Sequence, residues 1–233
     1  MRRRRRLPPP AATKAEGVYS GTLTGSSSSV FQLLVLENDE YWSLYGTSSA
    51  NAFFVAGFIQ GQGASSNGSF ASSNAKDFGI VPPASGTVSA TYVANTSISG
   101  TVAAPGGSVT FSGTPIAGST YDYNTPANLS TIAGSWSLTA LNGSSVALTV
   151  ATGGAFTGNS AGCSFTGTLT PRSSGKNVFN LSLTFGAAPC SLPNQTGTGV
   201  ALSSLLSGGT TRQLVIAGVN ASRTSGTVLF GTR

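Results

Sequence analysis

Hydrophobic and polar residues alternate with a period of two from Gly17 to the C-terminus. This alternation is typical of β-strands that bury one face. Short clusters of Gly, Ser, Asn and Asp interrupt it, and such clusters are typical of tight turns between strands. The i, i+3, i+4 spacing of a helical stripe is not sustained over the length that a helix needs. The pattern therefore predicts an all-β fold.

The alternation predicts eight strands in each half of the chain. In the first half they lie near residues 18–24, 30–36, 41–47, 53–60, 68–71, 87–93, 97–102 and 108–112. In the second half they lie near residues 134–141, 146–150, 155–157, 164–170, 178–185, 199–205, 213–219 and 227–230. Eight short strands in roughly a hundred residues suit a small antiparallel barrel. Closure also removes the exposed strand edges that a chain poor in charge cannot protect.

The two halves resemble each other. Gly17-Val-Tyr-Ser near the start of the first half matches Gly134-Ser-Trp-Ser near the start of the second. Near their ends, Phe111-Ser-Gly-Thr is similar to Phe230-Gly-Thr. These matches predict two barrels in tandem that are degenerate repeats of one unit.

A stretch without alternation separates the halves. Residues 114–130 contain two prolines and are predicted to be a linker. The barrels are therefore expected at residues 17–113 and 131–233. Residues 1–16 begin with a run of arginines and then prolines, which predicts a disordered basic tether.

Only 8% of the residues are charged and there is no histidine, whereas an average soluble domain has about 25% charged residues. The lack of histidine excludes Ser-His-Asp and Cys-His catalysis and histidine metal sites. We therefore expect no enzyme, no cofactor and no metal site built on histidine. The net charge of +6 comes mostly from residues 2–6, which are all arginine. The rest of the chain has seven cationic side chains and six carboxylates, a net charge of +1. Nucleic acid is for this reason not an expected partner.

The chain has two cysteines, Cys163 and Cys190. An even count without a CxxC motif, and without acidic neighbours to share a metal, favours a disulfide over two free cytosolic thiols. A disulfide points to an oxidising, extracytoplasmic compartment. The arginine run resembles the first part of a signal peptide, but no apolar segment follows it. We expect an export signal to be encoded upstream of Met1, and membrane attachment, if any, through a lipid anchor missing from this chain.

Three carboxylates gather in Glu37-Asn38-Asp39-Glu40. They could form a cage for a hard cation such as Ca²⁺. The alternative is a polar hairpin tip, with Asn38 and Asp39 in the turn.

Aromatic residues crowd the strand that follows. At a period of two, Tyr41 and Tyr45 share one face of this strand and Trp42 lies on the other. If one face is exposed, Tyr41, Trp42 and Tyr45 form a candidate binding surface for a protein or glycan. The alternative is that they pack in the core.

The second half resembles the lipocalins at Gly134-Ser-Trp136. In that family a Gly-x-Trp opening places a tryptophan at one end of an eight-stranded barrel, under a late arginine. The resemblance implies that Trp136 closes the second barrel. It also implies a covering arginine, which we assign to Arg223, with Arg233 as the alternative. In the first half Tyr19 replaces the tryptophan and no arginine follows.

Most of the body is similar to a group of proteobacterial secreted proteins and lipoproteins. The phrases that carry this likeness lie at residues 16–21, 35–46 and 175–185. The likeness implies an envelope location. Residues 61–70 and 98–102 also resemble the small barrels of surface lipoproteins that bind host proteins.

Together these features predict a non-enzymatic, extracytoplasmic binding or adhesion protein that recognises a protein or glycan at the cell surface. Two alternatives stay open. One is a structural component of the envelope or of a filament. The other is a lipocalin-like carrier of a small apolar ligand, which needs a hollow barrel. The oligomeric state is left undetermined by the sequence.

Overall fold

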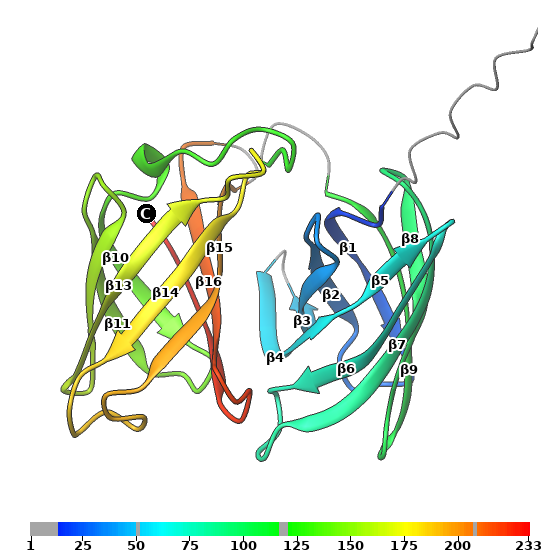
Figure 1. Ribbon diagram of the computed structural model, residues 1–233, viewed down its shortest axis with the longest axis horizontal. Helices are drawn as coiled ribbons and strands as arrows, with labels where there is room; N and C mark the ends of the chain where they lie inside the picture. The colour runs from blue at the N-terminus through cyan, green and yellow to red at the C-terminus, as the bar shows by residue number, and fades with distance from the viewer. Residues whose placement is uncertain (1–13, 50–51, 117–120, 207–208) are drawn as a thin grey trace, which may run out of the picture.

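The computed structural model of the chain describes residues 14–49, 52–116, 121–206 and 209–233. Strands form two antiparallel sheets, each closed into a barrel. The barrels lie side by side, the first coloured blue to green and the second green to red (Figure 1). The described ranges contain one helical element, the short 3-10 helix η1 (Leu129–Thr131). The predicted all-β class with two tandem eight-stranded barrels is confirmed.

The first barrel is a sheet of nine strands with the order β4-β3-β2-β1-β9-β8-β7-β6-β5. Its strands are β1 (Gly17–Thr24), β2 (Val30–Val35), β3 (Glu40–Ser49), β4 (Ala52–Gln62), β5 (Ala64–Ser66), β6 (Ser69–Asp77), β7 (Ala84–Val93), β8 (Ser97–Ala104) and β9 (Gly107–Pro115). Pairing of Ile59 with Asp77 and of Gln60 with Lys76 closes it.

The short strand β5 was not predicted. It follows β4 after the single residue Gly63 and pairs with β6, as β4 does. The two strands therefore act as one bent strand, and eight strands go round the barrel. The sequence around β5 is rich in Gly and Ser and lacks apolar alternation, which explains why its pattern gave no strand signal.

The second barrel closes in chain order from β10 to β17. Its strands are β10 (Gly134–Ala140), β11 (Ser145–Val150), β12 (Ala155–Ser160), β13 (Cys163–Pro171), β14 (Phe179–Phe185), β15 (Thr196–Leu205), β16 (Arg212–Asn220) and β17 (Gly226–Thr232). Along β10, buried Trp136, Leu138 and Ala140 alternate with exposed neighbours. The strand thus shows directly the period that predicted it.

Apolar side chains pack the interior of each barrel. In both barrels, each of the eight strands contributes at least one residue to a continuous cluster of buried or half-buried side chains. Tyr19, Phe31 and Phe111 are among those of the first barrel, and Trp136 and Phe179 among those of the second. The hollow that a lipocalin-like carrier needs therefore finds no support in these packed interiors.

One contact recurs in both barrels and relates them as repeats. The hydroxyl of Tyr19 donates to the carbonyl oxygen of Ala15 at 3.0 Å. The indole N–H of Trp136 donates to the carbonyl oxygen of Ile132 at 2.7 Å. Each acceptor lies four residues before its aromatic donor, and both Ala15 and Ile132 are fully buried. The aromatic residue near the start of each half, Tyr19 or Trp136, thus covers the equivalent end of its own barrel.

The predicted tether and linker differ from the structure where they can be compared. Residues 1–13 lie outside the described residues, but Ala15 belongs to the core of the first barrel rather than to a disordered tether. In the connection between the barrels, Tyr121 and Tyr123 are buried against both of them. Packing thus extends into segments that carry no strand pattern.

A third apolar core joins the two barrels. Outward-facing side chains of β2, β3 and β4 pack there against those of β15, β16 and β17. Phe58 is fully buried at its centre and stacks on Phe78, with ring centroids 4.7 Å apart. Gly226 in the second barrel permits the close approach, because a Cβ there would lie 2.8 Å from the Phe58 ring. The barrels therefore share a core and form one body.

Candidate functional site

The predicted disulfide is present. Cys163 and Cys190 are bonded with an S–S distance of 2.00 Å, which ties the first residue of β13 to the loop between β14 and β15. The bond is compatible with an extracytoplasmic location. In the described part of the chain, no helix has the length and apolarity to cross a membrane.

Trp136 is covered by Arg233, not by Arg223. The Arg233 guanidinium lies 4.1 Å from the centroid of the Trp136 ring. It also donates to the carbonyl oxygens of Ala133 at 2.6 Å and of Thr131 at 3.2 Å. The assignment of Arg223 is wrong because β17 is antiparallel to β10. The residue after β17 therefore lies beside the start of β10, and Arg223, which precedes β17, lies at the other end.

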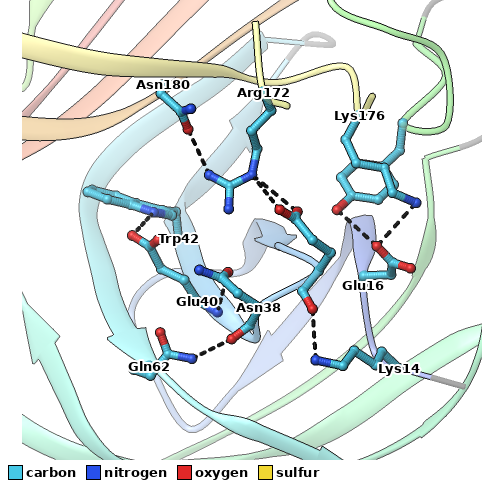
Figure 2. Close-up of polar contacts among 11 residues, drawn as sticks. Lys14, Glu16, Asn38, Glu40, Trp42, Gln62, Arg172, Lys176 and Asn180 are labelled. Carbon is cyan, nitrogen blue, oxygen red and sulfur yellow. Dashed lines mark hydrogen bonds and ion pairs between the residues drawn. The ribbon is translucent and has the colours of Figure 1, made fainter. Parts of the chain in front are cut away.

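Three cations of the second barrel bind the first barrel. Arg172 forms an ion pair with Glu37 at 2.9 Å, and Lys176 forms one with Glu16 at 3.2 Å (Figure 2). Arg223 donates to two backbone carbonyl oxygens of the first barrel, at 2.6 and 2.8 Å. Burial lowers the pKa of Arg223 below its usual value. These contacts flank the shared apolar core and fix the orientation of the two barrels.

The first barrel has a pocket at the end where Arg233 covers the second. In the first barrel Pro115 pairs with Tyr19, whereas in the second barrel Arg233 covers Trp136. Pro115 therefore stands at the position that the covering arginine has in the second barrel. The pocket beside it has a volume of about 370 Å³, and its lining includes Glu16 and Tyr123. Lys176 pairs with this glutamate and lies 4.9 Å from the centroid of the Tyr123 ring. A cation of the second barrel therefore already neutralises Glu16, one of the two carboxylates that line the pocket; the other is Asp122.

Each carboxylate of the predicted cation site binds partners of its own. Glu37 pairs with Arg172, and Glu40 accepts from the indole N–H of Trp42 at 3.0 Å (Figure 2). Asp39 accepts from the Ser65 hydroxyl at 2.6 Å and pairs with Lys14 at 3.2 Å. Among the described residues, no group of three acidic or cysteine side chains could hold a metal.

The predicted cage is therefore not formed, and the hairpin-tip alternative describes the segment. The Asp39 N–H donates to the carbonyl oxygen of Leu36 at 2.9 Å, and Asp39 has a φ of 65°. Aspartate tolerates this left-handed backbone better than most residues.

The predicted aromatic binding surface is wrong. Tyr41 is 2% exposed and Trp42 is 4% exposed. Tyr41 and Tyr45 point into the first barrel, where their hydroxyls donate to Ser72 at 3.1 Å and to Asp77 at 2.6 Å. Burial, and then the hydrogen bond to Asp77, raise the pKa of Tyr45 above its usual value. The other face of β3, which carries Trp42 and Leu44, packs against the second barrel and borders a cleft between the barrels.

A cleft of about 220 Å³ lies beside the shared core, between the outer faces of the two barrels. At its deep end Leu34 and Trp42 of the first barrel meet Val200 and Ala217 of the second, and all four are buried. Towards solvent the lining residues are half-buried, and Leu206 is exposed. The full lining consists of Val18, Gln32, Leu33, Leu34, Trp42, Leu44, Ile116, Tyr121, Val200, Leu202, Ser204, Leu205, Leu206, Gln213, Val215 and Ala217.

The cleft is apolar along its walls and polar at one end. Leu44, Leu202 and Val215 form half-buried walls. Register sets Gln32 beside Leu44 on the first barrel, and Ser204 beside Gln213 on the second. None of the described lining residues is charged. The cleft can therefore bind a neutral, mostly apolar group, and it holds no acid or base for catalysis.

The alternation of apolar and polar residues did not predict this cleft, although the sequence carries a signal for it. Residues 200–202 of β15 and residues 214–217 of β16 are apolar without interruption. Such runs are typical of strands that are buried on both faces. They mark the strands whose outer face packs on another element, but they do not identify that element.

The two barrels thus form one body with an apolar cleft between them, an acidic pocket at one end and a disulfide in the second barrel. Comparison of the chain with protein-family models, with curated proteins and with solved structures finds no match.

Proposed function

We propose that this chain is a non-enzymatic, extracytoplasmic binding protein that recognises a partner protein through the cleft between its barrels. The observation that supports this most is the half-buried apolar lining supplied by both barrels. The two barrels pack closely in the shared core, but beside it Leu44, Leu202 and Val215 stay partly open to solvent. Apolar surface that stays open beside a well-packed core is typical of protein-binding sites.

The lining favours a protein over a glycan as partner. Glycan recognition draws on exposed aromatic faces, and the rings of Tyr41 and Trp42 are buried. Aliphatic side chains line most of the cleft instead. These suit an apolar anchor residue of a protein partner.

Two features support binding outside the cytoplasm without catalysis. The histidine-free sequence and the engagement of Glu37, Asp39 and Glu40 in ion pairs and hydrogen bonds leave little for acid–base chemistry. The Cys163–Cys190 disulfide favours an oxidising compartment. Display at the cell surface is part of the proposal.

Peptide display against the purified protein tests the proposal. Peptides selected on the wild-type protein are then titrated against the double variant Leu44→Gln with Leu202→Gln, which makes both walls polar. The matched control is Val93→Gln, because Val93 is an apolar residue of β7 that is 60% exposed and does not line the cleft. We expect at least tenfold weaker binding to the double variant and unchanged binding to the control. Equal binding to all three proteins would rule out the cleft as the recognition site.

A further inference from the structure

The volume of the cleft limits what it can hold. Pockets for drug-sized ligands measure about 300–1,000 Å³, and the cleft measures about 220 Å³. A long acyl chain or a sterol exceeds this space. One bulky side chain with the atoms next to it fits.

The polar end of the cleft carries unused hydrogen-bonding groups. The side chains of Gln32, Ser204 and Gln213 are half-buried, and within the described residues none of them is hydrogen-bonded. A glutamine amide offers both donors and an acceptor, and a serine hydroxyl offers both as well. Gln32 comes from the first barrel and Gln213 from the second, so they can engage one group from two sides.

The lining has no charge to compensate a charged ligand. A charged group that enters an apolar site without a partner is strongly disfavoured by its desolvation. A neutral group that has both a donor and an acceptor loses little, because the three polar side chains can satisfy it. The peptide group has this combination.

Resting on the function proposed above, we infer that the cleft binds one bulky aliphatic side chain together with its neighbouring peptide group, in an extended and uncharged segment of the partner. The side chain lies between the walls formed by Leu44, Leu202 and Val215. The peptide group lies at the polar end, between Gln32 and Gln213. Occupation would bridge the two barrels, since each supplies one wall and one glutamine.

Trp42 makes this inference measurable. It lies at the deep end of the cleft, and the other tryptophan, Trp136, lies under Arg233 in the second barrel. In a Trp136→Phe background the tryptophan fluorescence comes from Trp42 alone. The titrants are blocked peptides Ser-Ser-X-Ser-Ser with X as Leu, Ala or Lys, and 1-octanol as a neutral apolar probe without a peptide group.

We expect the Leu peptide to shift the Trp42 emission at a concentration at least tenfold lower than the Ala or Lys peptide. The variant Gln32→Leu with Gln213→Leu should weaken the Leu peptide at least tenfold and affect 1-octanol, which has only one hydroxyl, less than threefold. Tighter binding of 1-octanol than of the Leu peptide, with no effect of the glutamine variant, would overturn the inference and indicate a neutral lipid instead. A shift that depends on protein concentration without any titrant would overturn it in favour of a second copy of this chain.

The two proposals fail separately. If 1-octanol binds but the peptides do not, the cleft is a binding site with a different occupant. If neither titrant affects Trp42 and the display-selected peptides ignore the Leu44 and Leu202 variant, the cleft itself is not the site.

Discussion

Phe58 offers the sharpest test of whether the two barrels form one cooperative body. Its ring is fully buried in the shared core, 4.7 Å from the ring centroid of Phe78 and 6.2 Å from that of Trp42. Replacing a buried phenylalanine by alanine costs about 3–5 kcal/mol, through lost burial and the cavity left behind. Because Phe58 belongs to the first barrel but contacts Gly226 of the second, Phe58→Ala should weaken both.

The substitution lies in the first barrel, and its expected effect is measured in the strands of the second barrel. At about 1.4 kcal/mol per tenfold change, the loss corresponds to roughly a hundredfold or more in the equilibrium for opening the interface. Hydrogen exchange measured by mass spectrometry resolves each strand. Amides of β15 and β16, which contain no substituted residue, should exchange at least tenfold faster in Phe58→Ala.

The matched control is Phe111→Ala, which removes a ring of the first barrel's interior. Phe111 packs edge-on against Phe31, with ring centroids 5.6 Å apart, and is not part of the shared core. It should cost a similar free energy yet change exchange in β15 and β16 much less. If Phe58→Ala fails to fold, Phe58→Leu provides the milder change. Unchanged protection of β15 and β16 in a destabilised Phe58 variant would refute the idea of a shared core.

Three further predictions concern the closing contacts and the tyrosines. The double variant Cys163→Ser with Cys190→Ser should lose about 3.5 kcal/mol of unfolding free energy in urea titrations, because a loop of this length is no longer closed in the unfolded chain. Arg233→Gln should lose about 1–3 kcal/mol in the same titrations, since it removes the cation over the Trp136 ring and weakens the hydrogen bonds to backbone carbonyls. Burial, and then nearby Tyr92 and Glu16, raise the pKa of Tyr19 to about 12. The unfolded chain therefore loses this proton first, so stability should be full below pH 10 and fall as the pH rises towards 12. Tyrosinate absorbance recorded during the pH titration checks this.

Each of these predictions has its own control. Dithiothreitol should not affect the cysteine variant, and wild-type stability that is insensitive to the reductant would contradict the disulfide prediction. Arg212→Gln is the control for Arg233, because Arg212 covers no aromatic ring in the described structure; an equal loss in both variants would argue against a special role of the terminal arginine. Tyr19→Phe should make the fall above pH 10 shallower. A fall that is unchanged in this variant would assign it to the other buried tyrosines, whose pKa values are also raised.

The candidate site shows why sequence patterns locate side chains only in part. The period of two correctly puts Tyr41 and Trp42 on opposite faces of β3. It cannot tell that both faces are covered, because the second cover comes from β15 and β16, more than 150 residues away in the chain. The three carboxylates near Asn38 are close in sequence, but the partners of Glu37 and Asp39, namely Lys14, Ser65 and Arg172, come from distant segments.

The sequence by itself determined the strands and the turns that connect neighbouring strands. Alternation fixes strands because successive side chains point to opposite faces, and clusters of Gly, Asn and Ser place the turns. The paired cysteines and the repeated aromatic openings likewise follow from composition and spacing. Only the tertiary structure decided which faces became interior, interface or cleft. That choice depends on how the two barrels dock, as when Arg233 rather than Arg223 covers Trp136 through the antiparallel register of β17 and β10. The cleft exists because the outer faces of two closed barrels match over only part of their contact, and no single strand's sequence encodes that mismatch.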